Sequence, residues 1–410
     1  MIQESNSQFK KCHTNDYICD MISFDNTKIA FKSKSNRELA WARVMFSLIG
    51  AKQLVAGGKL ILSASLKMGL PIGGVVKKTI YRQFCGGENI PACRVTAQKL
   101  VQYNIGSILN YSAEGKTTEK DFDFAVKEVL KTVKEAQENP NVSFCVFKMS
   151  GLGRVGLLEK ASLNEALSKS EEDEFGRVKL RVDALCKSAY ENGVKILIDA
   201  EESWIQTAID EVATEMMRAY NKEQAIVYNT IQMYRKDRLA FLKNSVAQAS
   251  ETGFKVGVKL VRGAYMDKER ERAHKMGYDS PIQETKKDTD NDFDAALRFC
   301  VENLGLVALC SGTHNEKSSY LLTELMQEYN VDKSDPLVYS SQLLGMSDQI
   351  SFNLAAAGYN VAKFVPYGPV REVIPYLIRR LEENTSVAGQ TGRELNLLVQ
   401  ETNRRKSGNK

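Results

Sequence analysis

The 410-residue chain lacks several features on which whole classes of protein depend. It has only three histidines, with no metal-ligand spacing among them, so a metal site is not expected. Its eight cysteines form no CxxC pair, and several stand in strand-like stretches, which predicts reduced, mostly buried thiols of an intracellular protein. No uncharged apolar run reaches the roughly 18–20 residues of a membrane span, because Lys52, Lys59 and Lys67 interrupt the most apolar region. The chain is therefore not expected to span a membrane.

Acidic residues are nearly absent from one stretch. Between Lys28 and Arg82 there are eleven lysines and arginines against a single acidic residue, Glu38. Such asymmetry predicts an anionic neighbour, for which a lipid surface is the first candidate. No zinc pattern, helix-turn-helix signature or aromatic RNA-binding motif accompanies the basic stretch, so nucleic acid is not an expected partner.

The first residues also lack a targeting pattern. They are polar and include Glu4, Asp16 and Asp20, which fits neither a secretory signal nor an Arg-rich transit peptide. We therefore expect a cytoplasmic protein that associates peripherally with the inner membrane, on the matrix side of mitochondria if the source is eukaryotic.

The chain does contain a regular alternation of short apolar runs and amphipathic stretches. Eight such units over about 280 residues match a (βα)8 barrel of the TIM type, and a doubly wound open sheet is the alternative. The predicted domains are an irregular segment (1–26), a helical arm (27–104), the barrel (105–400) and a frayed basic tail (401–410). The eight predicted strands are 105–111, 141–150, 195–200, 225–231, 255–261, 305–311, 336–342 and 360–365.

One motif points to a different fold. GLGRVG, from Gly151 to Gly156, fits GxGxxG and follows a predicted strand, as a dinucleotide-binding loop does. The next strand is far away, a charged run intervenes, and the acidic residue that should end a second strand is missing. A flexible loop over the barrel mouth is the better interpretation.

Polar and reactive residues recur where the predicted strands end. Barrel enzymes carry their chemistry at the carboxyl ends of strands. Taken singly, each residue has a structural explanation: a lysine extending to solvent, a helix-capping aspartate or a histidine at the barrel rim. Their common position favours an active site made from Lys148, Asp199, Gln232, the Lys259–Tyr265 segment, Thr313, His314, Asn315, Leu343 and Phe364.

A predicted helix after the last strand carries two adjacent arginines. In the sequence KFVPYGPVREVIPYLIRRLEENTS (363–386), Tyr376, Arg379, Arg380 and Glu383 fall on one helical face. Neighbouring guanidinium groups can bind a small carboxylate with geometry that lysine cannot copy. A solvated Arg-Arg pair is the alternative interpretation.

Together these motifs resemble the proline dehydrogenase (proline oxidase) family, FAD-dependent barrel enzymes of proline catabolism. The resemblance covers roughly residues 100 to 400 and rests on FCVFKMS, LIDAEE, KLVRGAY, THN, LLGM, VPYGP and YLIRRLEEN. It implies an α/β fold with a distorted (βα)8 barrel whose last helix lies over the mouth. It also implies oxidation of L-proline to Δ1-pyrroline-5-carboxylate, with hydride passing to flavin N5 and electrons to a membrane quinone.

The resemblance further implies roles for individual residues. Arg379 and Arg380 bind the proline carboxylate, Asp199 organises the pocket, and Lys259 stands near flavin N5. The catalytic set is Asp199, Lys259 and Tyr265, and the walls around the substrate ring are Lys148, Tyr265, Leu343 and Tyr376. The implied FAD-binding residues are Ala200, Gln232, Lys259, Val261, Arg262, Gly263, Ala264, Thr313, His314, Glu383 and Ser386.

Two departures from the family pattern leave alternatives open. Phe364 stands where members usually have tyrosine, so a close analogue such as hydroxyproline is an alternative substrate. KLVRGAY exchanges the basic residues of the RLVKGAY form, which leaves open whether Lys259 or Arg262 faces N5. A methylenetetrahydrofolate reductase type of barrel is disfavoured by the paired arginines. A non-enzymatic, basic membrane-surface scaffold rests on the amino-terminal arm alone.

Overall fold

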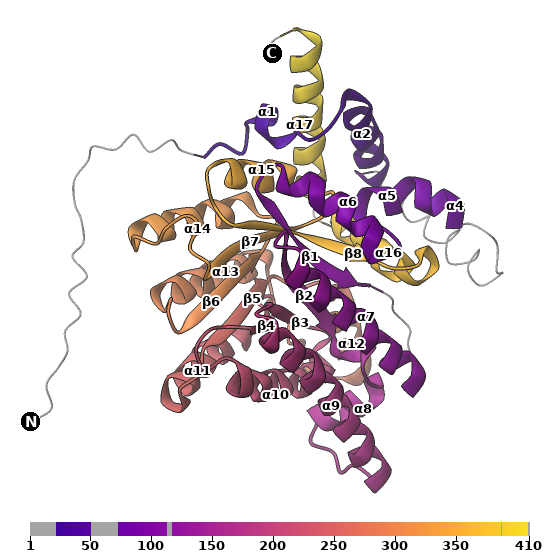
Figure 1. The fold of residues 1–410 in the computed structure, drawn as a ribbon, viewed down its shortest axis with the longest axis vertical. Coiled ribbons are helices and arrows are strands. Elements are labelled where there is room, and N and C mark those ends of the chain that lie inside the picture. Colours follow the sequence, from indigo (N-terminus) through magenta and orange to yellow (C-terminus); the bar gives the residue numbers. More distant parts are fainter. Residues whose placement is uncertain (1–21, 51–72, 113–116, 387, 409–410) are drawn as a thin grey trace, which may run out of the picture.

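Eight parallel strands form a closed barrel in which each strand pairs with the next and β8 pairs with β1 (Figure 1). The computed structural model describes residues 22–50, 73–112, 117–386 and 388–408, with the side chains of 382–391 outside the description. The closed barrel confirms the predicted TIM-type fold and excludes the open sheet. The strands are β1 (Ile105–Tyr111), β2 (Val142–Lys148), β3 (Ile196–Asp199), β4 (Val227–Gln232), β5 (Val256–Val261), β6 (Val307–Gly312), β7 (Val338–Leu343) and β8 (Val361–Tyr367).

Helices cover the outside of the barrel. Thr118, Ser168 and Thr285 begin three of them with capping boxes, in which side chain and backbone satisfy each other's free groups. The surrounding helices are α7 (Glu119–Glu138), α8 (Val155–Ser162), α9 (Lys169–Glu191), α10 (Ser203–Tyr220), α11 (Arg238–Thr252), α12 (Met266–Met276), α13 (Lys286–Glu302), α14 (Glu316–Glu328) and α15 (Asp348–Ala356). Helix α16 (Val370–Ser386) follows β8 and packs against the amino-terminal arm and the last helix.

The barrel interior is filled by alternate strand residues, as the two-residue period of a strand requires. Phe144, Tyr228 and Phe364 belong to this cluster, while the intervening residues pack outward against the helices. The six cysteines in the described ranges are buried free thiols, as predicted, whereas Cys12 and Cys19 lie outside those ranges.

The segment that carries GxGxxG is ordered, contrary to the predicted flexible loop. It forms a short 3-10 turn (Met149–Gly151) followed by α8, and Leu152 between them is buried. Arg154 Nε donates to Glu174 Oε1 over 2.7 Å and ties the segment to α9. Close packing on α9 accounts for Gly153, where a Cβ would overlap the Val178 side chain.

The amino-terminal arm packs on the outside of α16. It comprises α1 (Thr27–Ala30), α2 (Asn36–Gly50), α4 (Gly73–Val76), a π-helical turn (Lys77–Tyr81), α5 (Arg82–Phe84) and α6 (Ile90–Val101). Met45, Ile49 and Phe84 of the arm share a buried apolar cluster with Val373 and Leu377 of α16. The arm therefore supports the arginine-bearing helix from behind.

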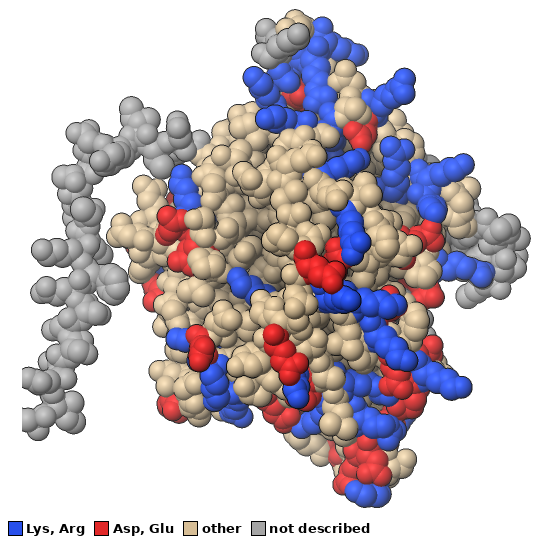
Figure 2. Space-filling model, in the orientation of Figure 1, with Lys and Arg blue, Asp and Glu red and all other residues tan. Residues whose placement is uncertain are grey.

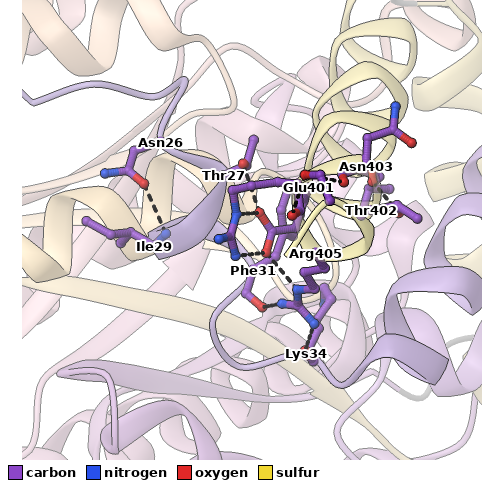
Figure 3. Close-up of polar contacts among 12 residues, drawn as sticks. Asn26, Thr27, Ile29, Phe31, Lys34, Glu401, Thr402, Asn403 and Arg405 are labelled. Carbon is purple, nitrogen blue, oxygen red and sulfur yellow. Dashed lines mark hydrogen bonds and ion pairs between the residues drawn. The ribbon is translucent and has the colours of Figure 1, made fainter. Parts of the chain in front are cut away.

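Helix α17 (Ala388–Lys406) joins the end of the chain to the arm (Figure 1). Buried Glu401 accepts hydrogen bonds from Thr27 Oγ1 at 2.9 Å and from Arg404 and Arg405 (Figure 3). Arg405 also donates to the carbonyl oxygens of Phe31 and Lys34. The predicted frayed tail from residue 401 is thus helical and packed as far as Lys406.

No helix within the described ranges is both long and apolar enough to cross a membrane. In the same part of the chain, no cluster of three or more histidine, cysteine, aspartate or glutamate side chains forms a possible metal site.

Candidate active site

A buried ion pair stands at the carboxyl end of the barrel. Lys259 Nζ of β5 donates to Asp199 Oδ1 of β3 over 2.6 Å, and both residues are less than a tenth exposed. The ammonium group also lies 4.8 Å from the ring centroid of Phe364 in β8. Each charge compensates the other, so removal of either side chain would leave an uncompensated charge in a buried place. The two predicted catalytic residues are thus in direct contact.

A second polar group adjoins the first at the ends of β2 and β5. Lys148 Nζ donates to the Tyr265 hydroxyl over 3.4 Å, and burial raises the pKa of Tyr265, which stays protonated. Glu201 accepts from both the backbone N–H and the hydroxyl of Ser150, and burial raises its pKa too. The sequence analysis assigned no role to Glu201, although it is the first glutamate of the LIDAEE motif.

Arg262 leaves the barrel interior and ties neighbouring elements together. Its guanidinium donates to Asp290 Oδ1 and Thr313 Oγ1, each over 2.7 Å, and to Ser318 Oγ over 2.9 Å. The next residue, Gly263, has φ +135°, and any Cβ there would overlap the Tyr234 ring, so glycine is required. Of the two exchanged basic residues in KLVRGAY, Lys259 lies inside the mouth and Arg262 at its rim.

His314 follows β6 and is held by a residue that the sequence analysis did not single out. Its Nδ1 lies 2.9 Å from the hydroxyl of Ser347, in the turn after β7. Burial lowers the pKa of His314 to about 3, with Lys363, Arg380 and Arg262 acting in the same direction. The imidazole is therefore neutral at physiological pH and keeps one N–H donor.

Helix α16 brings its arginine face to the same mouth. Arg380 is buried, and its guanidinium stacks 5.0 Å from the ring centroid of Tyr376 one turn earlier. Arg379 acts electrostatically on Tyr265, and Arg380 acts on His314. Leu343 at the end of β7 packs against the cluster that contains Tyr376. The predicted substrate residues thus converge, whereas the side chains of Glu383 and Ser386 lie outside the described set.

The strand ends fit a large, polar and partly anionic cofactor such as FAD. Gln232 at the end of β4 is almost fully buried, and its Oε1 has no hydrogen-bond partner among the described residues. A buried acceptor without a partner is costly unless a ligand supplies an N–H, and the isoalloxazine ring has one. Val261 of β5 is paired with Gln232 in the barrel. The other predicted cofactor residues Ala200, Arg262, Ala264 and His314 follow the carboxyl ends of β3, β5 and β6.

The family model described as proline dehydrogenase matches residues 93–393. The chain belongs to the proline dehydrogenase family. It is accordingly an FAD-dependent oxidoreductase that acts on proline. The match covers the whole barrel together with most of α6 and the arginine-bearing α16.

Individual relatives agree with this assignment. Proline dehydrogenase 1, mitochondrial, of Dictyostelium discoideum is 31% identical over 94% of this chain and 75% of its own length. The hydroxyproline dehydrogenase of Xenopus laevis is 32% identical over 92% of this chain and 88% of its own. The crystal structure of proline utilization A (PutA) from Bdellovibrio bacteriovorus matches 88% of this chain with a TM-score of 0.69 at 20% identity. This chain spans 38% of that PutA, and the likeness concerns the fold.

Proposed function

We propose that this member of the proline dehydrogenase family removes a hydride from C5 of L-proline and forms Δ1-pyrroline-5-carboxylate. The observation that carries the proposal is the convergence of α16 on the strand ends. Arg379 acts on Tyr265 and Arg380 on His314, while the Lys259–Asp199 pair lies in the same mouth. Bound FAD supplies the hydride acceptor.

The arginines of α16 position the substrate. Arg379 and Arg380 hold the proline carboxylate through charge-assisted hydrogen bonds, with geometry fixed by the stack of Arg380 on Tyr376. Lys148, Tyr265 and Leu343 border the ring on the side of the strands. A desolvated pocket with this many cations disfavours the ammonium form of proline, so the neutral amine is available when C5 loses hydride.

The Lys259–Asp199 pair adjusts charge at the strand ends. Asp199 fixes the Lys259 ammonium at 2.6 Å and keeps it inside the mouth instead of in solvent. A fixed cation beside the acceptor stabilises the negative charge that develops during hydride transfer. In this proposal Lys259, rather than Arg262, stands closest to the reacting atoms.

A spectroscopic titration tests the proposed reaction. The purified protein should carry the absorption bands of oxidised flavin, and anaerobic L-proline should bleach them, while buffer alone should not. A folded protein that takes up no FAD, or a flavin band that L-proline leaves unchanged, would contradict the proposal.

A second candidate substrate is 4-hydroxyproline. The observation in its favour is Phe364, whose ring sits beside Lys259 without the hydroxyl that a tyrosine would add. The similarity to the Xenopus hydroxyproline dehydrogenase is in keeping with it. The same titration with trans-4-hydroxyproline measures how the protein ranks the two substrates.

We further propose that the arm contacts an anionic membrane and that electrons pass to a membrane quinone. Val44, Leu48 and Val75 of the arm are between 47% and 68% exposed. Exposed basic residues Arg37, Lys78 and Arg82 accompany them. Figure 2 shows lysines and arginines gathered in the upper part of the view, around α2 and α17. This surface suits the cytoplasmic or matrix face of an inner membrane.

A further inference from the structure

The turn after β7, from Leu343 to Asp348, has an unusual backbone. Gly345 has φ +77° and Ser347 has φ +50°, although serine rarely adopts the left-handed region. Ser347 is completely buried. A conformation of this kind persists only where surrounding groups hold it, and it marks sites where geometry matters for function.

Groups from distant parts of the chain hold this turn. Lys363 Nζ of β8 donates to Met346 O over 2.5 Å and pairs with Asp348 at 3.0 Å. From the arm, Lys34 pairs with Asp348 at 2.9 Å, and Gln83 Nε2 donates to Gly345 O over 2.9 Å. These contacts hold the turn at Gly345, Met346 and Asp348.

Helix α17 supplies the contact to Ser347 itself. The carboxyl group of Glu394 accepts the backbone N–H of Ser347, and Glu394 is only 4% exposed. The side chain of the same serine then lies 2.9 Å from His314 Nδ1. A continuous chain of contacts therefore runs from α17 through Ser347 to a residue of the candidate cofactor site.

We propose that Glu394 is a positioning residue for the flavin site. By binding the Ser347 N–H, it fixes the Ser347 hydroxyl as a donor to His314 Nδ1, so that Nε2 keeps its hydrogen and would be a donor for the bound cofactor. This inference rests on the proposed role of His314 in binding FAD. It assigns to α17, which lies outside the barrel, a part in cofactor binding.

Two substitutions at position 394 separate this role from general packing. Glu394→Leu removes the acceptor, while Glu394→Gln retains a side-chain oxygen that can accept the Ser347 N–H. The FAD dissociation constant of the apoprotein, measured by flavin fluorescence, should rise about three- to tenfold for Glu394→Leu, the effect of one lost hydrogen bond. It should stay near the wild-type value for Glu394→Gln, and only the leucine variant should shift the visible flavin spectrum.

Glu401 offers a matched control on the same helix. It also ties α17 to the arm, through Thr27, but it makes no contact with the turn at Ser347. Glu401→Leu should lower the melting temperature yet leave the FAD dissociation constant within about twofold, because distant sites act independently. Equal losses of FAD affinity in Glu394→Leu and Glu401→Leu would mean that docking of α17 is all that matters, and the positioning role would be overturned.

Ser347→Ala keeps the test decisive if Glu394→Leu fails to fold. This variant retains the N–H bonded to Glu394 and loses only the hydroxyl beside His314, so FAD affinity should fall as for Glu394→Leu. Unchanged affinity in Ser347→Ala overturns the inference. If wild type binds FAD and His314→Ala weakens binding while Glu394→Leu and Ser347→Ala do not, the inference alone fails. If wild-type protein binds no FAD, the proposed function fails with it.

Discussion

Several cationic side chains lie at the barrel mouth, and their contacts with other side chains differ. Lys259 is bound to Asp199, and Arg262 to Asp290, so each already has a carboxylate of the chain within 2.7 Å. That makes both poor candidates for binding the carboxylate of proline. On α16, the Arg380 guanidinium stacks on Tyr376 at the same mouth, and we propose that the paired arginines of this helix bind the carboxylate instead.

Replacement of Arg380 by methionine tests this division. The change should cost roughly 2–5 kcal/mol of substrate binding, because it leaves a carboxylate oxygen in a desolvated site without its partner. KM for L-proline should rise strongly while FAD content largely survives. Even one lost ionic hydrogen bond should raise KM by more than about fivefold. A smaller rise would reject the carboxylate role of Arg380.

Phe364→Tyr tests substrate choice. The new hydroxyl would enter beside Lys259, which lies 4.8 Å from the Phe364 ring, and near Asp199. One added hydrogen bond is worth about 0.5–1.5 kcal/mol, so proline turnover should change by only about two- to tenfold. KM for proline should fall and activity on 4-hydroxyproline should drop. The measurement is kcat/KM for both substrates, and an unchanged ratio would make Phe364 a simple part of the apolar wall.

Glu394 predicts a specific dependence of stability on pH. Burial raises its pKa to about 8; Asp348 acts in the same direction, while the Ser347 N–H, Lys363 and Lys34 oppose it. Between the unfolded pKa near 4.5 and the folded value, unfolding releases a proton, so this group's contribution to stability is lost as pH rises.

The comparison with Glu394→Gln isolates that contribution, because glutamine does not titrate. The melting temperature of the wild-type apoprotein should fall relative to that of the variant as pH rises from about 5 to about 8. If the melting temperatures of wild type and Glu394→Gln instead change with pH in parallel, Glu394 is ionised in the folded protein.

At the scale of elements, one face of the arm packs on α16 and the opposite face is exposed to solvent. Its buried face, with Met45, Ile49 and Phe84, packs on the helix that carries the arginines. Its outer face exposes Val44, Leu48 and Val75. Membrane contact through this face would therefore occur directly behind the helix that carries the paired arginines.

Vesicle co-sedimentation tests the membrane contact. Binding to anionic vesicles should weaken by on the order of 1 kcal/mol per charge removed and should decrease with added salt. The test variant replaces three exposed basic residues of the arm by glutamine: Arg37, Lys78 and Arg82. The control replaces three exposed lysines of α7: Lys127, Lys131 and Lys134. Equal binding of wild type to neutral and anionic vesicles, or equal losses in both variants, would remove the membrane proposal.

The strands were predictable because each is a short apolar run ended by a polar or turn residue. The same rule located Lys148, Asp199 and His314, since strand ends of one barrel meet at one mouth. The role of Ser347 was not predictable, because a left-handed backbone at serine has no sequence signal. Glu394 was equally hidden, since an isolated glutamate on an amphipathic helix ordinarily faces solvent.

At the scale of the whole molecule, hydrogen bonds between the arm and α17 join early and late segments of the chain. Arg405 donates to Phe31 O, Lys34 O and Asn36 Oδ1, and Glu401 accepts from Thr27. These bonds join segments more than 360 residues apart. The fold thus depends on a long-range closure in addition to the barrel ladder.

Arg405→Ala tests the closure. Loss of its backbone contacts should destabilise the protein by about 1–3 kcal/mol, because the freed carbonyl groups are partly buried. Lys406→Ala removes the same charge from an exposed neighbour and serves as control. Chemical denaturation of both variants measures the difference, and indistinguishable midpoints would show that the closure adds nothing to stability.

The contact between the arm and α17 also orders events during synthesis on the ribosome. Thr27, Phe31 and Lys34 emerge early, yet their partners Glu401 and Arg405 are translated more than 360 residues later. At about 5–20 residues per second, the arm waits on the order of 20–70 seconds for them. For most of that interval α16 (Val370–Ser386) has not been translated either, so the apolar face of the arm is uncovered and open to chaperones. The arm is therefore open to aggregation during synthesis until α16 has been translated and can pack on it.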